Sequence, residues 1–116
     1  MPTKRVYFND TVTPLAGDAA FTGTTRDTDA YDGNVNPFGG SMFTAMCVSS
    51  HVSATAGFKI EMSNDGSTWR TAASSTLVAD TPNILTVFIV TRYYRVKLTN
   101  AGTLQTNVML NSAIVS

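Results

Sequence analysis

The sequence predicts an all-β protein, a single domain folded as an antiparallel β-sandwich or jelly roll. Several short runs alternate apolar and polar residues with a period of two, which is typical of strands with one buried face. Gly, Asn and Asp turns separate these runs, and no helical period is visible. The 116 residues include 18 threonines, whose branched side chains favour strands, and suffice for one core.

The first 40 residues carry the weakest pattern. We expect residues 1–20 to form an N-terminal arm or a first strand, and residues 21–116 to form the sandwich, within one domain overall. Residues 22–40 are polar and rich in Asp, Gly and Pro, which predicts a long loop. A loop of this length in a compact domain typically has a function or is ordered by a neighbouring subunit.

Two apolar runs are expected to lie inside the sheets. Residues 41–51 are partly apolar on both faces, which predicts a central strand or one whose outer face meets another chain. Residues 84–90 form the most apolar run of the sequence. We therefore expect this run to pass through the middle of a sheet.

Residues 58–69 predict the β-hairpin around which the sandwich is organised. An alternating run ends at Asp65-Gly66, and this dipeptide is a strong hairpin signal because Gly accepts a positive φ. Trp69 then opens the return strand. We expect its large indole to cap one end of the core.

The last two strands follow the same alternation. In residues 93–100, Tyr94 is expected to face the core and Arg95 to face outward, with Glu61 as a cross-strand partner. The final strand is expected within residues 105–116, with a bulge that changes the face of residues 113–115.

Composition argues against several classes of partner. Eight basic residues balance eight acidic ones, so no net charge attracts nucleic acid or an anionic membrane. No signal peptide or membrane-spanning run is visible, and we expect a soluble chain made in a cytoplasm. Only 14% of the residues are charged, which indicates a surface partly covered by other subunits.

The sequence predicts no enzyme and no cofactor. Cys47 and His51 are the only thiol and imidazole, and on one strand they would lie roughly 13 Å apart, too far for a nucleophile and its base. We expect Cys47 to be a small buried residue and His51 a polar residue at a strand end.

A metal site is the weaker of two interpretations of the Asp-rich loop. Asp27, Asp29 and Asp32 have the spacing of half a calcium loop, but Tyr31 stands where such a loop needs a ligand. The other interpretation is a solvated loop whose Asp side chains form Asx turns. We therefore predict no metal ligand.

Two stretches carry a family resemblance. Residues 63–69, Ser-Asn-Asp-Gly-Ser-Thr-Trp, and residues 91–97, Thr-Arg-Tyr-Tyr-Arg-Val-Lys, resemble a pattern of discoidin-like, galactose-binding jelly rolls. Residues 94–106 are more similar to small β-sandwich virion proteins of bacteriophages, in which such a strand precedes Ala-Gly-x-x-Gln-Thr. The resemblance covers about residues 58–110. It implies a jelly-roll fold and a place in a virion assembled in the host cytoplasm, commonly as a homo-oligomer, with a trimer favoured.

Two functions follow as hypotheses. In the first, the chain is a phage capsid decoration (cement) protein that binds neighbouring capsid or tail subunits through its arm and loops. In the second, it is a carbohydrate-binding module of a tail or fibre that binds glycan through loop aromatics. Four aromatic residues without a clear strand partner are the candidate partner-binding residues: Tyr7, Phe8, Tyr31 and Phe38. Five others are assigned structural roles: Asp65, Gly66, Trp69, Tyr94 and Arg95.

Overall fold

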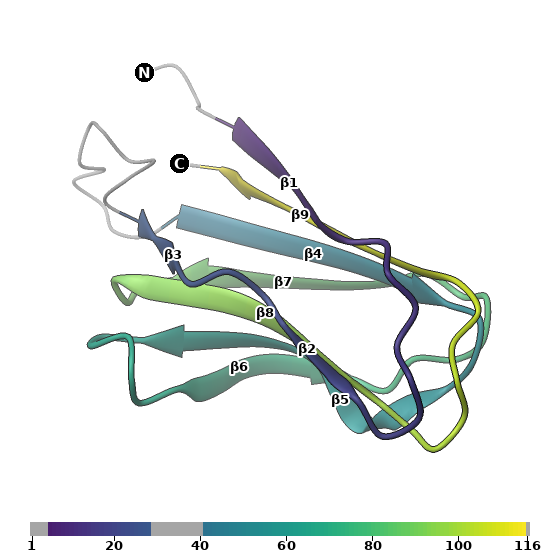
Figure 1. Cartoon of the computed structure of the whole chain (residues 1–116). Coiled ribbons are helices and arrows are strands. Elements are labelled where there is room, and N and C mark those ends of the chain that lie inside the picture. The colour runs from purple at the N-terminus through teal and green to yellow at the C-terminus, as the bar shows by residue number, and fades with distance from the viewer. Residues whose placement is uncertain (1–4, 29–40, 116) are drawn as a thin grey trace.

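The chain folds as a sandwich of two antiparallel sheets, which a computed structural model describes for residues 5–28 and 41–115 (Figure 1). The first sheet contains, from edge to edge, β1 (Arg5–Thr11), β9 (Val108–Val115), β4 (Ser41–Ser49) and β7 (Asn83–Ile89). The second contains β2 (Ala20–Thr22), β8 (Tyr93–Asn100), β5 (Ser53–Ser63) and β6 (Arg70–Ser75), and β3 (Arg26–Asp27) also pairs with β8.

The order of the strands is that of a jelly roll. Without the two-residue β3, the first sheet holds the first, eighth, third and sixth strands, and the second sheet holds the second, seventh, fourth and fifth. Each layer therefore takes strands from both halves of the chain, as two Greek keys require. The predicted all-β antiparallel sandwich is confirmed.

The core lies between the sheets and is built from the inward side of the alternation. On β4, Phe43, Ala45 and Cys47 are fully buried, and on β8 Tyr94 is fully buried. The rings of Phe43 and Tyr94, one from each sheet, have centroids 4.8 Å apart. Because each buried Å² of apolar surface contributes about 25 cal/mol, such contacts between the layers dominate the stability of the sandwich.

The position of β7 corrects one prediction. This most apolar strand does not run through the middle of a sheet, because it pairs with β4 on one side and forms an edge of the first sheet. Its outward residues Ile84 and Phe88 are 62% and 64% exposed. The run is therefore apolar because its exposed outer face also carries apolar residues, and not because the strand lies in the middle of a sheet.

The hairpin between β5 and β6 forms where it was expected, but with a longer turn. Residues 64–69 connect the strands, so the turn is not a two-residue one. Gly66 has a φ of 78°, as the Asp-Gly signal predicts. Trp69 does not cap the core: its indole lies under the guanidinium of Arg95, 4.0 Å from Cζ to the ring centroid, on the outer side of the second sheet. The Arg95–Trp69 attraction explains this placement.

Irregular pairing occurs at other places than predicted. β9 keeps one inward face from Val108 to Ile114 and pairs with β4 without a register shift. The prediction of a bulge at residues 113–115 is therefore wrong. In β1 the register shifts between Asn9 and Thr11, which leaves Asp10 as an extra residue.

The N-terminal part also differs from a simple arm followed by a loop. Residues 5–11 are strand β1, which pairs with β9 along its whole length. The stretch expected to be a loop, residues 22–40, includes β3, and its residues 29–40 lie outside the described part of the chain. Within residues 5–28 and 41–115, no helix has the length and apolarity needed to cross a membrane.

Candidate partner-binding surface

The outer side of the first sheet is an apolar surface, which we call the apolar face. Three of the five methionines of the chain lie on it, and Tyr7 and Phe88 are 71% and 64% exposed. Its residues alternate with core residues along β1, β9, β4 and β7. Its apolar residues are Tyr7, Met42, Met46, Val48, Ile84, Phe88, Met109, Ala113 and Val115, and the uncharged polar residues Asn9, Thr44, Thr86 and Asn111 lie among them.

A shallow groove crosses the apolar face where β1, β9 and β4 lie side by side. It has a volume of about 650 Å³, and its lining includes Tyr7, Val12, Met46, Met109 and Asn111. Methionine side chains are flexible and polarisable, so they fit the shapes of different partners. The groove is therefore suited to an apolar side chain from another protein rather than to a charged ligand.

Charge is almost absent from the apolar face. Among the described strand residues that point outward from this sheet, only Arg5 is charged, at the far edge. Its guanidinium donates a hydrogen bond to Tyr7 Oη at 3.2 Å. Charged residues are depleted and Tyr and Met enriched in the cores of protein interfaces, so this composition is that of an interface.

The outer side of the second sheet is charged instead. Arg95 Nε donates to Glu61 Oε1 at 2.8 Å, with both side chains mostly buried at 18% and 11% exposure. This is the cross-strand pair that the alternation predicts. Lys59 and Lys97 lie directly opposite each other in the same pairing. We call this surface the charged face.

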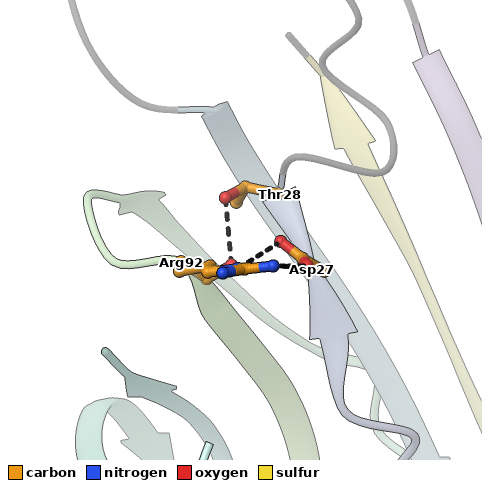
Figure 2. Close-up of polar contacts among 3 residues, drawn as sticks. All are labelled: Asp27, Thr28 and Arg92. Carbon is orange, nitrogen blue, oxygen red and sulfur yellow. Dashed lines mark hydrogen bonds and ion pairs between the residues drawn. The ribbon is translucent and has the colours of Figure 1, made fainter. Parts of the chain in front are cut away.

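A polar cluster fastens β3 to the turn between β7 and β8 (Figure 2). Arg92 donates from Nη2 and Nε to Asp27 Oδ2 at 3.0 and 3.1 Å. Thr28 donates from Oγ1 and from its backbone N–H to the carbonyl oxygen of Arg92, at 2.9 and 2.8 Å. The guanidinium of Arg92 also lies 5.0 Å from the ring centroid of Tyr93. The cluster is largely exposed, so each contact contributes little to stability, but together they hold Asp27 and Thr28 beside the β7–β8 turn.

A third ion pair lies inside the sandwich. Asp10, the extra residue of the β1 bulge, has a side chain that is 1% exposed and accepts from Arg26 Nη2 at 3.1 Å and Ser112 Oγ at 2.6 Å. Arg26 also lies over the ring of Phe8, 3.5 Å from Cζ to the centroid. The pair links β1 and β9 of the first sheet to β3 of the second.

The candidate partner-binding residues are placed differently from one another. Tyr7 lies on the apolar face, whereas Phe8 points inward and packs against the core. Tyr31 and Phe38 lie outside the described residues. The alternation within residues 5–11 carries the signal that separates Tyr7 from Phe8.

Asp65 is one of the residues to which the sequence analysis assigned a structural role. Asp65 Oδ1 accepts from the backbone N–H groups of Ser67 and Thr68, both at 2.8 Å, and from Ser63 Oγ at 2.9 Å. The N–H of Thr68, then that of Ser67, then the Ser63 hydroxyl lower the pKa of Asp65 to about 2. The carboxylate of Asp65 thus holds the β5–β6 loop.

Cys47 and His51, the only thiol and imidazole of the sequence, lie in different surroundings. Burial raises the pKa of the Cys47 thiol to about 12, so the reactive thiolate is suppressed at neutral pH. His51 Nδ1 lies 3.1 Å from Ser50 Oγ. That oxygen accepts from the N–H groups of Thr106 and Asn107 and donates to Gln105 Oε1, so it serves the packing of the loops.

The Asp-rich segment is only partly visible. Asp27 is bound to Arg92, and Asp29 and Asp32 lie outside the described residues. Within the part of the chain that the structure describes, no three His, Cys, Asp or Glu side chains are grouped as metal ligands.

Two of the described aromatic residues have one ring face already covered, which restricts glycan binding there. Trp69 and Tyr93 each have an arginine guanidinium over one ring face. A sugar that stacks on that side would have to displace it. Tyr31 and Phe38, the candidates within the predicted loop of residues 22–40, lie outside the described residues.

Sequence-family comparison assigns almost the whole chain. The family model described as "Uncharacterised protein YqxG N-terminal domain" matches residues 2–115. The chain belongs to the YqxG N-terminal domain family. The description states no activity for the YqxG N-terminal domain, and a comparison with curated proteins finds no match.

Solved structures show the same fold as this YqxG N-terminal domain. The PBSX exported protein XepA matches with a TM-score of 0.78 and 19% identity, over 94% of this chain and 36% of that chain. This chain therefore spans about a third of the XepA structure. A Bacillus endospore appendage protein, from disulfide-linked pili, matches with a TM-score of 0.52 and 12% identity, over 99% and 87% of the two chains. At these identities the likeness concerns the fold alone.

A third solved structure, from infectious bursal disease virus strain Gx, has a TM-score of 0.43 and 13% identity, over 97% of this chain and 32% of that chain. At that TM-score it carries no argument about this YqxG N-terminal domain.

The sequence interpretation was wrong for one of the two apolar runs. Residues 84–90, with Ile84 and Phe88, were expected in the middle of a sheet but form an edge. Residues 41–51 were expected to form a central strand or one whose outer face meets another chain, and β4 is central, between β9 and β7. The sequence did carry a signal for this surface. Only 14% of the residues are charged, and none of them lies on either face of these two apolar runs. Apolar faces without charge indicate contact with another protein.

Proposed function

We propose that this chain is a non-enzymatic structural subunit of a phage-type particle, which binds neighbouring subunits through the apolar face. In its finer form, the proposal is that of a capsid decoration (cement) protein located in the virion and assembled in the host cytoplasm. The observation that carries it is the apolar face, with Tyr7, Met46, Ile84 and Phe88 turned to solvent and a single charge at its edge.

The size of the apolar face fits this use. Four strands about 4.8 Å apart, each about eight residues of 3.3 Å, cover roughly 500 Å² in all, including the uncharged polar residues among the apolar ones. A patch of this size lies within the range of the largest apolar patches on monomers, which are often functional. It provides most of the roughly 800 Å² that a stable interface buries on each partner, and polar residues at its rim supply the rest.

Two further observations support the proposal. The thiol of Cys47 is buried with a raised pKa, and Ser50 and His51 are engaged in loop packing, so the described residues offer no activated nucleophile. The fold is shared with the exported phage protein XepA and with a pilus subunit, and a particle that repeats one weak contact many times gains avidity.

A binding assay tests the proposal. Purified protein is mixed with particles prepared without it and sedimented, and bound protein is measured as a function of concentration. We expect saturable binding that weakens at least about tenfold with Met46→Lys, because a charge in the groove must be desolvated on binding.

The matched control is Thr71→Lys, which adds the same charge to the exposed strand β6 of the other sheet. Its binding should equal that of the unchanged protein. Equal binding by all three proteins would exclude the apolar face, and a protein that never sediments with particles would exclude the proposed function.

A further inference from the structure

The edges of the two sheets are protected in different ways. Exposed strand edges attract other strands, and proteins protect them with charges, bulges or short lengths. β1 carries Arg5 and a bulge at Asp10. β6 starts with Arg70, and Ala72 is an extra residue where its register with β5 shifts. On the remaining edge, β2 and β3 are only three and two residues long.

β7 is the exception. Its seven residues contain no charge, no proline and no glycine, and it pairs with β4 in one unbroken register from Ser41↔Ile89 to Cys47↔Asn83. Its other edge faces away from β4. Leu85 and Val87, on the inward side, are only partly buried, because no strand lies beyond them in this sheet. The strand thus has the properties of an edge that another strand covers.

The sequence of β7 is complementary to itself. When two copies lie antiparallel about a two-fold axis at Thr86, the middle residue, all seven residues are paired. Thr86 then faces its own copy, Ile84 faces Phe88 of the other copy, Leu85 faces Val87, and Asn83 faces Ile89 at the two ends. Thr–Thr and aromatic–β-branched pairs are favourable across strands, and no like charges meet. A shift of the axis by one residue leaves only five residues paired.

We infer that two copies of this chain join through β7 to form a symmetric dimer with one continuous eight-stranded sheet. The pairing satisfies the outward backbone groups of both edges and covers Leu85 and Val87 from the side. It also brings the two apolar faces onto one surface, which doubles the area offered to a partner. Two-fold pairs are the commonest homo-oligomers, and each uses the same patch twice.

The inference goes beyond the proposed function, and the two can fail separately. A dimer needs no particle, and a monomer can still bind a particle through the apolar face. The mass of the free protein decides the first question, and sedimentation with particles decides the second.

Analytical ultracentrifugation of the unchanged protein over a range of concentrations is the first measurement. We expect a species of twice 12.4 kDa that dissociates on dilution. A monomer at every concentration would overturn the inference. A trimer or larger ring would also overturn it, since a seven-residue edge paired about a two-fold axis closes after two copies.

Charge substitutions test the register. Ile84→Lys and Phe88→Glu, each alone, should weaken the dimer about tenfold or more, because a charge is then placed against an apolar residue of the other copy. The double substitution I84K/F88E places opposite charges face to face at both positions and should restore the dimer. Both side chains are exposed in the single chain, so folding is preserved, which circular dichroism checks.

Two controls complete the test. I84K/F88K places like charges face to face and should remain monomeric. This control shows that the dimer is restored by opposite charges and not by any second charge. Thr86→Cys should give a cross-linked dimer under mild oxidation, whereas Thr71→Cys on the edge of the other sheet should not. Failure of I84K/F88E to restore the dimer, together with equal cross-linking at positions 71 and 86, would overturn the two-fold pairing at Thr86.

Discussion

The two outer faces of the sandwich differ although their inner faces are alike. Both sheets bury an alternating apolar row, with Phe43 from one and Tyr94 from the other in contact. Outward, the first sheet presents methionine, isoleucine and phenylalanine, whereas the second presents the Glu61–Arg95 pair. The fold thus dictates the inward residues only. The outward residues depend on what each face contacts, which is water on the charged face and, in our proposal, another protein on the apolar face.

The largest expected effect separates inward from outward apolar residues of the first sheet. Phe43→Ala should lower the free energy of unfolding by about 4 kcal/mol, because it leaves a cavity between the sheets. The matched change Phe88→Ala on the neighbouring strand should alter it by no more than about 0.5 kcal/mol in the dilute monomer. Urea unfolding measures both. Equal losses would mean that the apolar face is part of the folded monomer's own stability.

The next effect concerns the ion pair that joins the sheets. Asp10→Ala should destabilise the protein by about 3 kcal/mol, because it leaves the mostly buried Arg26 without its carboxylate. Asp27→Ala removes a carboxylate from the exposed pair with Arg92 and should cost less than about 1 kcal/mol. Thermal or urea unfolding compares the two. A larger loss for Asp27→Ala would contradict the ranking by burial.

A smaller effect is expected on the charged face. Arg95→Ala should cost about 2 kcal/mol, since Glu61 stays mostly buried without its donor and Trp69 loses its cationic partner. Lys97→Ala is the control, and because Lys97 lies opposite Lys59, its removal should be neutral or slightly stabilising. A double substitution of Arg95 and Glu61 gives the coupling energy of the pair.

The smallest effect depends on pH and concerns the loop beside the charged face. The folded protein lowers the pKa of Asp65 to about 2, so its carboxylate adds stability above its ordinary pKa of about 3.9, and this is lost as the pH falls towards 2. Asp65→Asn should therefore melt at a lower temperature than the unchanged protein at pH 7, and the difference should shrink to a small fraction at pH 2, where about half of the Asp65 carboxylates are protonated. A difference as large at pH 2 as at pH 7 would show that charge is not the cause.

The sandwich was predictable because alternation is local. Tyr94 inward, Arg95 outward and Gly66 with a positive φ all follow from neighbouring residues. The position of β7 was not predictable in this way, because an apolar run has the same pattern in the middle of a sheet and at an edge beneath a partner. Trp69 was misplaced for a similar reason, since its attraction to Arg95 depends on a contact across 26 positions of the sequence.

The candidate surface was predictable in part. Tyr7 was a candidate because it lacks a clear strand partner in the sequence, and an outer face that meets another chain was one alternative for residues 41–51, but the apolar face exists only once β1, β9, β4 and β7 lie in one sheet. The Asp10–Arg26 pair joins two bends of the chain that no local pattern relates. Such features depend on topology rather than on neighbouring residues.

The pairing of β1 with β9 has a practical consequence. Arg5 and Val115 are direct cross-strand partners, so their Cα atoms lie within about 5.5 Å of each other. A cargo protein fused ahead of residue 5 or after residue 115 would be displayed at the same pole of the sandwich. A circular permutant closed there by a few glycines and opened between residues 101 and 107 should retain every strand of the native fold.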